Sequence, residues 1–448
     1  MLKRYPLAWF ITWFVVLFVL PAPLVLLLHM GLDAPLEKIV IYDLGTICYV
    51  WWLISVALSA RPSWLDRRIG LPEIYFIHGF LGVLALGAGT IHVFNTKTPK
   101  AIVYWTGQIA WYLAIFGLLY AIFFLSGWLV DRMPIARGIK QRVTRILKHQ
   151  VSVRIHQLHF VVIGLILVHV HVITKIASIP GFLIVIDAYT VFAVGTYLWA
   201  KAVVNESKRR RGYVLSNTPL NRDTHQLVIR LDEQAPGYEP GDFYFLSFRG
   251  TTAISPEPHP FSATYTPAVE ATNLEAFTHH PKTTPHTRLL TFTIRELGDF
   301  TQHISKVPID TTVQLEGPFG RFNRVLRDDS PTQRLVLIGM GTGIAPILSL
   351  ALGYAAIRPV TIFHTVHTED DFYYVDQFEA LQEAHEETVY HRKIHRYTPE
   401  AIAELMGDDL SCARYVIVGG ASAVLKMHHV LVGLGVPAHH IVDERLTM

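Results

Sequence analysis

The sequence predicts a multidomain membrane protein with a six-helix transmembrane bundle, an antiparallel β-barrel and a doubly wound α/β domain. Two observations support this prediction. Roughly the first 200 of the 448 residues are dominated by Leu, Ile, Val, Phe, Trp and Tyr, whereas the rest has the composition of a water-soluble protein. Within that second part, short strand patterns give way to alternating strands and helices. We expect domains at residues 1–205, 206–330 and 331–448.

The bundle is predicted from six apolar stretches, each close to the length of about 20 residues that a membrane-spanning helix needs. They lie near residues 7–28, 41–60, 72–94, 104–130, 152–174 and 179–200. The first stretch follows Lys3 and Arg4, as the apolar part of a signal peptide would, but it is long enough to span a bilayer and further spans follow it. We therefore interpret it as a retained helix.

The charges of the connecting segments predict how the bundle lies in the lipid bilayer. Lys and Arg are concentrated after the second, fourth and sixth stretches, whereas the alternate segments carry only Lys38, Lys97, Lys100 and Lys175. By the positive-inside rule, both termini and the water-soluble half lie in the cytoplasm, and the protein is a multi-pass protein of the cell membrane. The net charge of +3 does not indicate a nucleic-acid partner.

The water-soluble half is predicted to contain two folds. Short segments rich in β-branched and aromatic residues indicate barrel strands at Gln226–Leu231, Phe243–Phe248, Leu289–Ile294 and Thr312–Leu315. A loop is expected to be inserted in the barrel near 267–287. The later segments alternate as in a parallel sheet. Its strands are expected at Arg334–Gly339, Val360–Val366 and Tyr415–Gly419, and its helices at Ile344–Tyr354, Asp376–Glu386 and Ala421–Leu434.

Histidines inside the apolar stretches are candidate functional residues, because ionisable side chains are costly within a membrane. His78 and His92 are 14 residues apart on the third stretch, which places both on one side of a helix and about 21 Å apart along its axis. On the fifth stretch, His156 is level with His78, and His169 and His171 are level with His92. Two facing pairs of histidines can hold two b-type haems, with His78 and His156 at the inner one.

Helical phase leaves the outer partner on the fifth stretch open. A regular helix places His169 about 140° out of phase with His156, and His171 about 60° out of phase. His169 therefore requires a π-bulge or another irregularity in the helix. His159, on the same stretch, is interpreted as a structural histidine.

One motif in the barrel domain predicts contacts to a flavin ring. His259, Pro260, Phe261 and Ser262 stand at the start of an expected strand. The aromatic ring can pack against an isoalloxazine ring, and the hydroxyl can hydrogen-bond to it. A plain turn that contains proline is the alternative interpretation of these four residues.

A second motif in this domain, within Thr293–Thr301, suits a pyrophosphate. Arg295 offers a forked donor, and Gly298 allows close approach of the backbone. Thr301 can begin a helix whose N-terminal amides favour anions.

A glycine-rich turn follows the first strand of the α/β domain and precedes a helix. Its candidate ligand-binding residues are Gly339, Gly341, Thr342, Gly343 and Pro346. The glycines let a nicotinamide dinucleotide approach the backbone, and the N-terminus of the helix faces its phosphates.

Together these motifs resemble the ferric reductase and NADPH oxidase superfamily, and in particular its prokaryotic NADPH oxidases. The resemblance covers essentially the whole chain, and it implies FAD, two haems b and NAD(P)H as cofactors. The superfamily pairs histidines 14 apart on the third helix with histidines 13 apart on the fifth, so the resemblance assigns His169, with His92, to the outer haem. Its flavin motifs stand here as His259–Ser262 and Gly298–Thr301, and the turn Gly341–Pro346 is similar to that of ferredoxin reductases.

The chain departs from its relatives at three places that the resemblance assigns to the flavin and nicotinamide sites. Gly419 and Gly420 follow Val418 where relatives carry Cys-Gly-Pro. Leu446 stands where relatives often have an aromatic residue that covers the flavin. His367 occupies the place of an arginine that holds the 2′-phosphate of NADPH in relatives.

The resemblance implies a transmembrane flavohaem oxidoreductase of the NAD(P)H oxidase or ferric reductase kind. Electrons from cytosolic NADPH or NADH would pass through FAD and the haems to oxygen, forming superoxide, or to a ferric chelate outside. One alternative is a haem subunit that supplies electrons to another redox protein of the cell envelope. Another is a metal transporter lined by histidines, which leaves the flavin and nicotinamide motifs unexplained.

Overall fold

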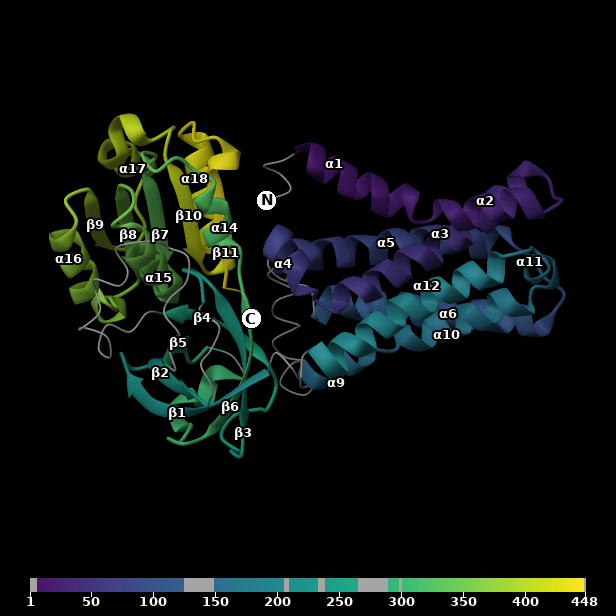
Figure 1. Cartoon of the computed structure of the whole chain (residues 1–448), viewed down its shortest axis with the longest axis horizontal. Helices are drawn as coiled ribbons and strands as arrows, with labels where there is room; N and C mark the ends of the chain where they lie inside the picture. Colours follow the sequence, from purple (N-terminus) through teal and green to yellow (C-terminus); the bar gives the residue numbers. More distant parts are fainter. Residues whose placement is uncertain are drawn as a thin grey trace. The chain divides into compact units, whose positions relative to one another are not determined.

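The computed structural model describes residues 6–124, 149–204, 209–232, 238–264, 289–297 and 300–446. The chain divides into two compact units, Met1–Leu65 with Ile69–Val204 and Asp66–Arg68 with Asn205–Met448, and each unit is described by itself (Figure 1). The inserted loop expected near 267–287 and most of the basic segment after the fourth apolar stretch lie outside the described residues.

The first unit contains the six predicted apolar helices, which confirms this part of the predicted fold (Figure 1). Each is long and apolar enough to cross a membrane, over Trp9–Gly31, Leu36–Ser59, Glu73–Asn95, Ala101–Phe124, Val151–Val172 and Phe182–Ala202. Their helical segments are α1 (Pro6–Phe14), η2 (Val15–Val19), α2 (Ala22–Gly31), α3 (Leu36–Ser59), α5 (Leu71–Asn95), α6 (Ala101–Phe124), α9 (His149–His156), α10 (His159–Val172), α12 (Phe182–Trp199) and η3 (Ala200–Val204), with the short helices α4 (Ser63–Ile69) and α11 (Thr174–Ala177) between spans.

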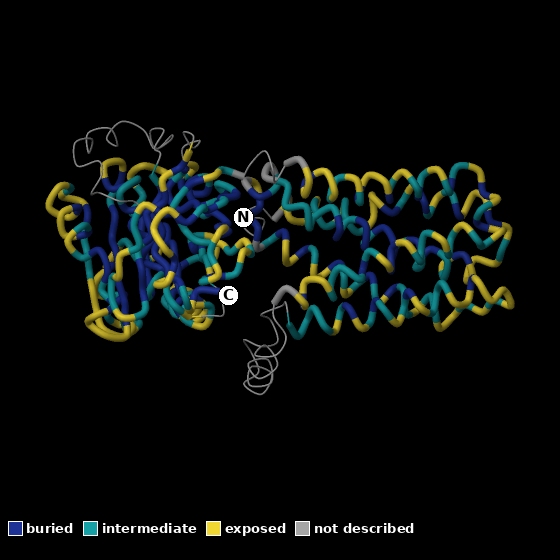
Figure 2. Tube along the Cα trace, turned by 90° about the horizontal axis from the view of Figure 1, so that it is seen from below, coloured by how far each residue is buried: buried dark blue, intermediate teal, exposed yellow. Residues whose placement is uncertain are grey.

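Large apolar side chains cover the outside of this unit. Exposed residues follow the outer sides of the helices and buried ones lie between them (Figure 2). Met30 is 83% exposed, and Phe94 and Phe192 are 71% and 72% exposed. Water-soluble monomers rarely expose continuous apolar surfaces of this kind, whereas helices satisfy their own backbone hydrogen bonds and can therefore lie in hydrocarbon. The surface of the first unit is thus suited to lipid.

Two of the connections that carry few basic residues meet at one end of the bundle. The Lys100 Nζ donates a hydrogen bond of 2.6 Å to the Thr174 Oγ1, which joins the segment before α6 to α11. Helix α4 and the start of α9 lie at the opposite end (Figure 1). These two basic-poor connections therefore lie at the end of the bundle opposite to α4 and the start of α9.

The second unit begins with a closed antiparallel barrel, in agreement with the prediction. The strands follow the order β1-β2-β5-β4-β3-β6. Leu290, Phe292 and Ile294 of one strand lie in the barrel core, so the alternate residues face outward. The strands are β1 (Arg209–Pro219), β2 (Thr224–Leu231), β3 (Phe243–Arg249), β4 (His259–Thr264), β5 (Leu289–Arg295) and β6 (Thr312–Phe319).

A five-stranded parallel sheet with helices on both faces follows, so the predicted doubly wound fold is also confirmed. The strand order is β11-β10-β7-β8-β9. One apolar cluster packs α14, α15 and α16 on one face, and a second packs α17 and α18 on the other. The elements are α14 (Phe322–Arg327), β7 (Leu335–Met340), α15 (Ile344–Tyr354), β8 (Val360–Val366), α16 (Val375–Ala384), β9 (Thr388–Ile394), α17 (Pro399–Met406), β10 (Arg414–Gly419), α18 (Ala421–Gly433) and β11 (Ile441–Arg445).

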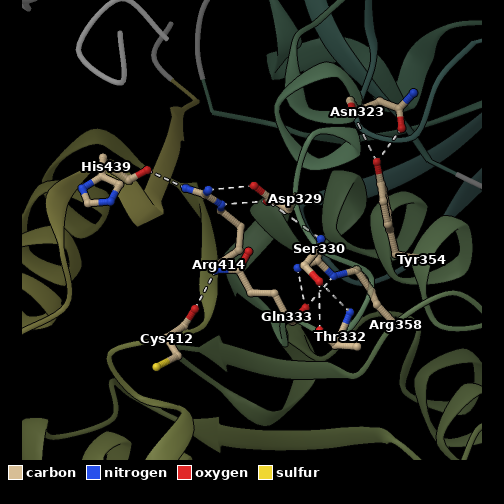
Figure 3. Close-up of polar contacts among 10 residues, drawn as sticks. All are labelled: Asn323, Asp329, Ser330, Thr332, Gln333, Tyr354, Arg358, Cys412, Arg414 and His439. Carbon is tan, nitrogen blue, oxygen red and sulfur yellow. Dashed lines mark hydrogen bonds and ion pairs between the residues drawn. The ribbon is translucent and has the colours of Figure 1, made fainter. Parts of the chain in front are cut away.

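A cluster of buried charges lies where strands of the sheet begin (Figure 3). Arg414 donates from Nη2 and Nε to the two carboxylate oxygens of Asp329, at 2.7 and 2.8 Å. Arg358 places its Nη1 3.8 Å from the same carboxylate and donates from Nε to the Gln333 carbonyl at 2.8 Å. The three charged side chains are 2–3% exposed. This carboxylate therefore neutralises one of two buried guanidinium groups and links the end of α14 to β10.

We expect Asp329→Asn to destabilise the sheet, because both guanidinium groups would lose their buried counter-charge. The expected cost is about 3–5 kcal/mol in local opening free energy. Hydrogen exchange of peptides from β7 and β10 measures this quantity. The matched control is Asp409→Asn, which removes the partner of Arg334 in a pair whose carboxylate is 50% exposed; it should cost under about 1 kcal/mol. Equal loss of protection in both variants would contradict the prediction.

Candidate functional site

Histidines of two helical spans face one another at two levels of the bundle. His78 and His92 lie on α5, whereas His156 ends α9 and His169 lies on α10. At one level, the ring centroids of His78 and His156 are 5.8 Å apart. At the other level, His92 and His169 line one cavity. The structure therefore brings together the histidines that the sequence places at matching depths.

The cavity at the second level is bounded by glycines where the imidazoles approach a neighbouring helix. A Cβ added at Gly45 of α3 would lie 2.9 Å from the His92 Nδ1, and one at Gly107 of α6 would lie 3.0 Å from the His169 Cε1. The first distance is shorter than real Cβ atoms show, and the second is tighter than nearly all real Cβ contacts. Any larger residue at either position would therefore displace an imidazole.

Backbone carbonyls fix the proton on three of these four imidazoles. Each Nδ1 donates to a carbonyl on a neighbouring helix, His78 to Ser55 at 2.9 Å, His92 to Ile41 at 2.8 Å and His169 to Val103 at 3.0 Å. Because a carbonyl oxygen only accepts, the neutral ring carries its proton on Nδ1 and its lone pair on Nε2. Histidines that bind metals are usually oriented by a hydrogen bond of this kind.

The span that carries His156 and His169 is not one continuous helix. The residues at 157 and 158 form a turn between α9 and α10. This turn is tightened, with hydrogen bonds to carbonyls three residues earlier, and such a turn advances by about 120° per residue instead of 100°. The helix irregularity that the sequence requires for His169 is therefore present, as a tightened turn instead of a π-bulge.

His171 lies in a different environment from His169. It is exposed, its Nδ1 donates to the Leu167 carbonyl one turn earlier at 2.9 Å, and its Nε2 is 3.4 Å from the Asp187 carboxylate. Among the residues that the structure describes, those that line the cavity do not include His171. The structure therefore groups His169, and not His171, with His92.

The two motifs that predict a flavin site meet on the barrel. The His259 ring at the start of β4 stacks on the Phe300 ring, with centroids 3.7 Å apart and planes 15° apart. The Phe261 ring is 6.1 Å from Phe300, and Pro260 and Ser262 belong to the same strand. Flat aromatic faces are thus gathered at one edge of the barrel.

The pyrophosphate motif ends β5 and continues into the short 3₁₀ helix η6 (Thr301–Lys306). Arg295 donates from Nε and Nη2 to one oxygen of Asp223, at 2.9 and 2.8 Å, which fixes the plane of its guanidinium. The Thr301 hydroxyl accepts a hydrogen bond of 3.0 Å from the Leu297 amide. Gly298 lies outside the described residues.

The parallel sheet has its topological switch point between β7 and β10, where the chain order of the strands reverses. Ligands of doubly wound sheets bind in the crevice at the carboxyl ends of the strands at such a point. Gly341 and Gly343 follow β7 there, and Gly419 and Gly420 end and follow β10. A Cβ at Gly343 would collide with the Val418 carbonyl. The two turns are therefore packed directly against each other.

The remaining predicted nicotinamide residues lie at the same edge of the sheet. Gly339 is buried in β7, where an added Cβ would lie 2.7 Å from the Ile344 Cδ1. Thr342 is partly exposed in the turn, and Pro346 is buried in the first turn of α15. His367 follows β8 and is exposed.

The C-terminal segment reaches this crevice through its backbone. The Leu446 amide donates a hydrogen bond of 2.8 Å to the Gly419 carbonyl. Its side chain packs against the apolar cluster on the α15 face of the sheet. Leu446 therefore lies beside the glycine turn that follows β10.

Two tyrosines that the sequence analysis does not single out connect the sheet to the barrel. The Tyr374 hydroxyl is 2.6 Å from the Thr293 Oγ1 and accepts from the Gln226 Nε2 at 3.1 Å. The Tyr373 hydroxyl donates to the Thr224 Oγ1 at 2.9 Å. Burial raises the pKa of Tyr373 to about 12, so its hydroxyl remains protonated at neutral pH. The adjacent tyrosines give no motif by which the sequence could have identified them.

Comparison with known proteins finds a family match within the α/β domain of the second unit. Residues 337–404 match the family model of the oxidoreductase NAD-binding domain. The match begins in β7 and ends in α17, and it includes the glycine turn after β7. No curated protein matches the chain.

Solved structures also match the chain. A flavohaemoglobin of Malassezia yamatoensis with bound FAD and haem is 15% identical, with 96% of this chain and 100% of that chain covered and a TM-score of 0.49. The cytochrome P450 reductase GcoB of Amycolatopsis is 19% identical, with coverage of 54% and 70% and a TM-score of 0.44. A ferredoxin NADP⁺ reductase of Neisseria gonorrhoeae with FAD and NADP is 16% identical, with coverage of 53% and 98% and a TM-score of 0.42.

We expect Gly343→Ala to weaken nicotinamide binding by about tenfold or more, because a methyl group there would push apart the turns after β7 and β10. Calorimetric titration of the purified protein with NAD⁺ and with NADP⁺ measures the affinity. The matched control is Gly433→Ala at the end of α18, where an added Cβ meets nothing within 4 Å; it should bind like the wild type. Wild-type affinity in Gly343→Ala would show that the turns do not form the binding crevice.

Proposed function

We propose that this chain is a transmembrane oxidoreductase that takes electrons from NADH or NADPH in the cytoplasm and delivers them to an acceptor on the other side of the membrane. Its redox groups are FAD and two b-type haems. The acceptor is oxygen, which would yield superoxide, or a ferric chelate, which would yield ferrous iron. One observation carries the proposal: an oxidoreductase NAD-binding domain shares the chain with two pairs of histidines that face each other among apolar helices.

The residues of the bundle fit two haems. We propose His78 and His156 as ligands of the inner haem and His92 and His169 as ligands of the outer one. Three of the four present an Nε2 lone pair because a carbonyl holds the Nδ1 proton. The Nδ1 of His156 is buried and has no hydrogen-bond partner among the described residues. Bound haem would supply one-electron redox chemistry at a potential that its axial ligands and apolar surroundings set.

The outer level also offers a cavity beside the proposed ligands. His92 and His169 both line it. Its lining is mainly aliphatic and aromatic, and Gly45 and Gly107 let the two imidazoles stand beside it without crowding. These properties support a haem held between α5 and α10 and shielded from water.

The barrel residues fit FAD. We propose that His259, Pro260, Phe261 and Ser262 hold the ring system, with Arg295, Gly298 and Thr301 at the pyrophosphate and Leu446 in the covering position. Arg295 is suited to this because Asp223 fixes its guanidinium plane while its side chain remains one-third exposed. Bound FAD would convert a two-electron donor into single-electron steps.

NAD(P)H is proposed to bind the crevice of Gly339, Gly341, Thr342, Gly343, Pro346, Gly419 and Gly420, with His367 near its ribose. The proposed domains are residues 1–205, 206–330 and 331–448.

We expect His92→Ala and His169→Ala each to lower the haem content from two to about one per chain, because each removes one axial ligand of the outer haem. The matched control is His171→Ala, which should keep both haems. The pyridine haemochrome assay gives haem per protein, and the Soret band gives the spectrum. Unchanged haem content and spectrum in both ligand variants would refute the outer-site assignment, and a wild type without a Soret band would refute the haem proposal as a whole.

The transfer itself is tested in proteoliposomes with NADH or NADPH supplied to one side and oxygen or a ferric chelate probed on the other. The expected product is superoxide or ferrous iron on the side opposite to the nucleotide. We expect His78→Ala to abolish both products, because it removes a ligand of the inner haem, whereas reduction of the flavin by nucleotide should persist. Product on the same side as the nucleotide, or transfer that survives in His78→Ala, would contradict the proposed route.

A further inference from the structure

The tightened turn between α9 and α10 changes which backbone carbonyls accept hydrogen bonds from helix amides. The amides of Leu158 and Phe160 donate to carbonyls three residues earlier, those of Ile155 and Gln157, at 3.0 Å each. In a regular α-helix the amide of Phe160 would instead donate to the carbonyl of His156, four residues earlier. The turn therefore removes the helical donor from the carbonyl of a proposed haem ligand.

His159 supplies a donor to that carbonyl. Its Nδ1 donates to the His156 oxygen at 2.7 Å, and the residue is only 9% exposed. Water is scarce among apolar helices, so a carbonyl that loses its helical partner must find another one within the protein. The imidazole of His159 meets this requirement, and the hydrogen bond stabilises the tightened turn.

Neighbouring helices hold the His159 ring in place. A Cβ added at Gly117 of α6 would lie 2.5 Å from the His159 Cε1. The Trp52 ring of α3 is 5.7 Å from the ring of His159, and the ring of His156 is 4.9 Å from it. A displacement of His159 would thus reach His156 both through the backbone carbonyl and through direct ring contact.

The same turn affects the phase between the two proposed ligands of this span. Three hydrogen bonds of the tightened kind occur here, including one from the Val161 amide to the Leu158 carbonyl at 2.9 Å. At about 20° of extra rotation each, they reduce the offset between His156 and His169 by about 60° relative to a regular helix. The turn therefore helps both ligands to face α5.

We propose that His159 is a positioning residue for the inner haem, which holds the tightened turn through the His156 carbonyl and so orients the His156 ring toward His78. The proposal rests on the proposed function, because it presupposes His156 as a haem ligand. It assigns to His159 a role without iron ligation. The competing assignment, in which His159 itself is the ligand, is distinguished by the variants below.

The experiment uses four variants of the full-length purified protein, and His156→Asn, which should lose the inner haem, is measured beside them. His159→Leu removes the donor, whereas His159→Asn retains an amide donor near the position of Nδ1. Gly117→Ala displaces the ring without changing His159. Gly164→Ala is the matched control on α10, because an added Cβ there meets nothing within 4 Å. Haem content and the low-spin ferric signals in electron paramagnetic resonance are the measurements, and neither requires turnover.

We expect all four variants to retain two haems per chain. One of the two low-spin signals should shift in His159→Leu and in Gly117→Ala, whereas His159→Asn and Gly164→Ala should give the wild-type spectrum. The unshifted outer signal in each variant reports that the bundle has folded.

Two results would overturn this inference while the proposed function stands. The first is a wild-type spectrum in both His159→Leu and Gly117→Ala. The second is loss of one haem in His159→Asn together with retention of both in His156→Asn, which would make His159 the ligand. A wild type without haem would instead overturn the proposed function, and this inference with it.

Discussion

The first unit depends on one constraint: among apolar helices, a polar group must find its partner within the protein. An imidazole N–H placed there has few acceptors, and the second lone pair of a helix carbonyl is the nearest one. His78 and His92 on α5 and His169 on α10 all use it. The carbonyl that accepts this hydrogen bond decides which nitrogen keeps the lone pair and in which direction that nitrogen points. Hydrogen bonding to the backbone thus orients these side chains before any ligand is present.

Hydrogen bonding alone would not allow the imidazoles to lie between the helices, because α3, α5, α6 and α10 are closely packed. Space is provided by glycines at Gly45, Gly107 and Gly117, each in contact with one histidine. Small residues at helix contacts are the usual means by which spanning helices approach closely. Here they admit a ring instead of a second backbone. The positions of His92, His169 and His159 are therefore each encoded on two helices, one that carries the histidine and one that carries the glycine.

Periodicity and composition predict most of the fold. The six apolar helices, the barrel and the alternating sheet follow from local patterns. Strand β1 is absent from the prediction because its basic residues Arg209–Arg211 are interpreted as the charged flank of a membrane span. In the structure they pair with Glu316, Leu315 and Gln314 of β6. The spacing of His78 and His92 is likewise local. The geometry of His169 is not, because the tightened turn depends on His159 and on the space beside Gly117 of another helix. Contacts between distant segments, such as Arg295 with Asp223, cannot be read from either segment alone.

In the second unit, backbone contacts determine the path of the chain at the crevice of the sheet, whereas the side chains determine its surface. The turns after β7 and β10 are in contact, since a methyl group at Gly343 has no room beside the Val418 carbonyl. The chain end is attached to this arrangement by a backbone hydrogen bond from Leu446 to the Gly419 carbonyl. Because a backbone amide makes this hydrogen bond, the position of residue 446 does not depend on its side chain. The side chain of Leu446 therefore sets the shape of the surface beside the crevice but not the path of the chain that reaches it.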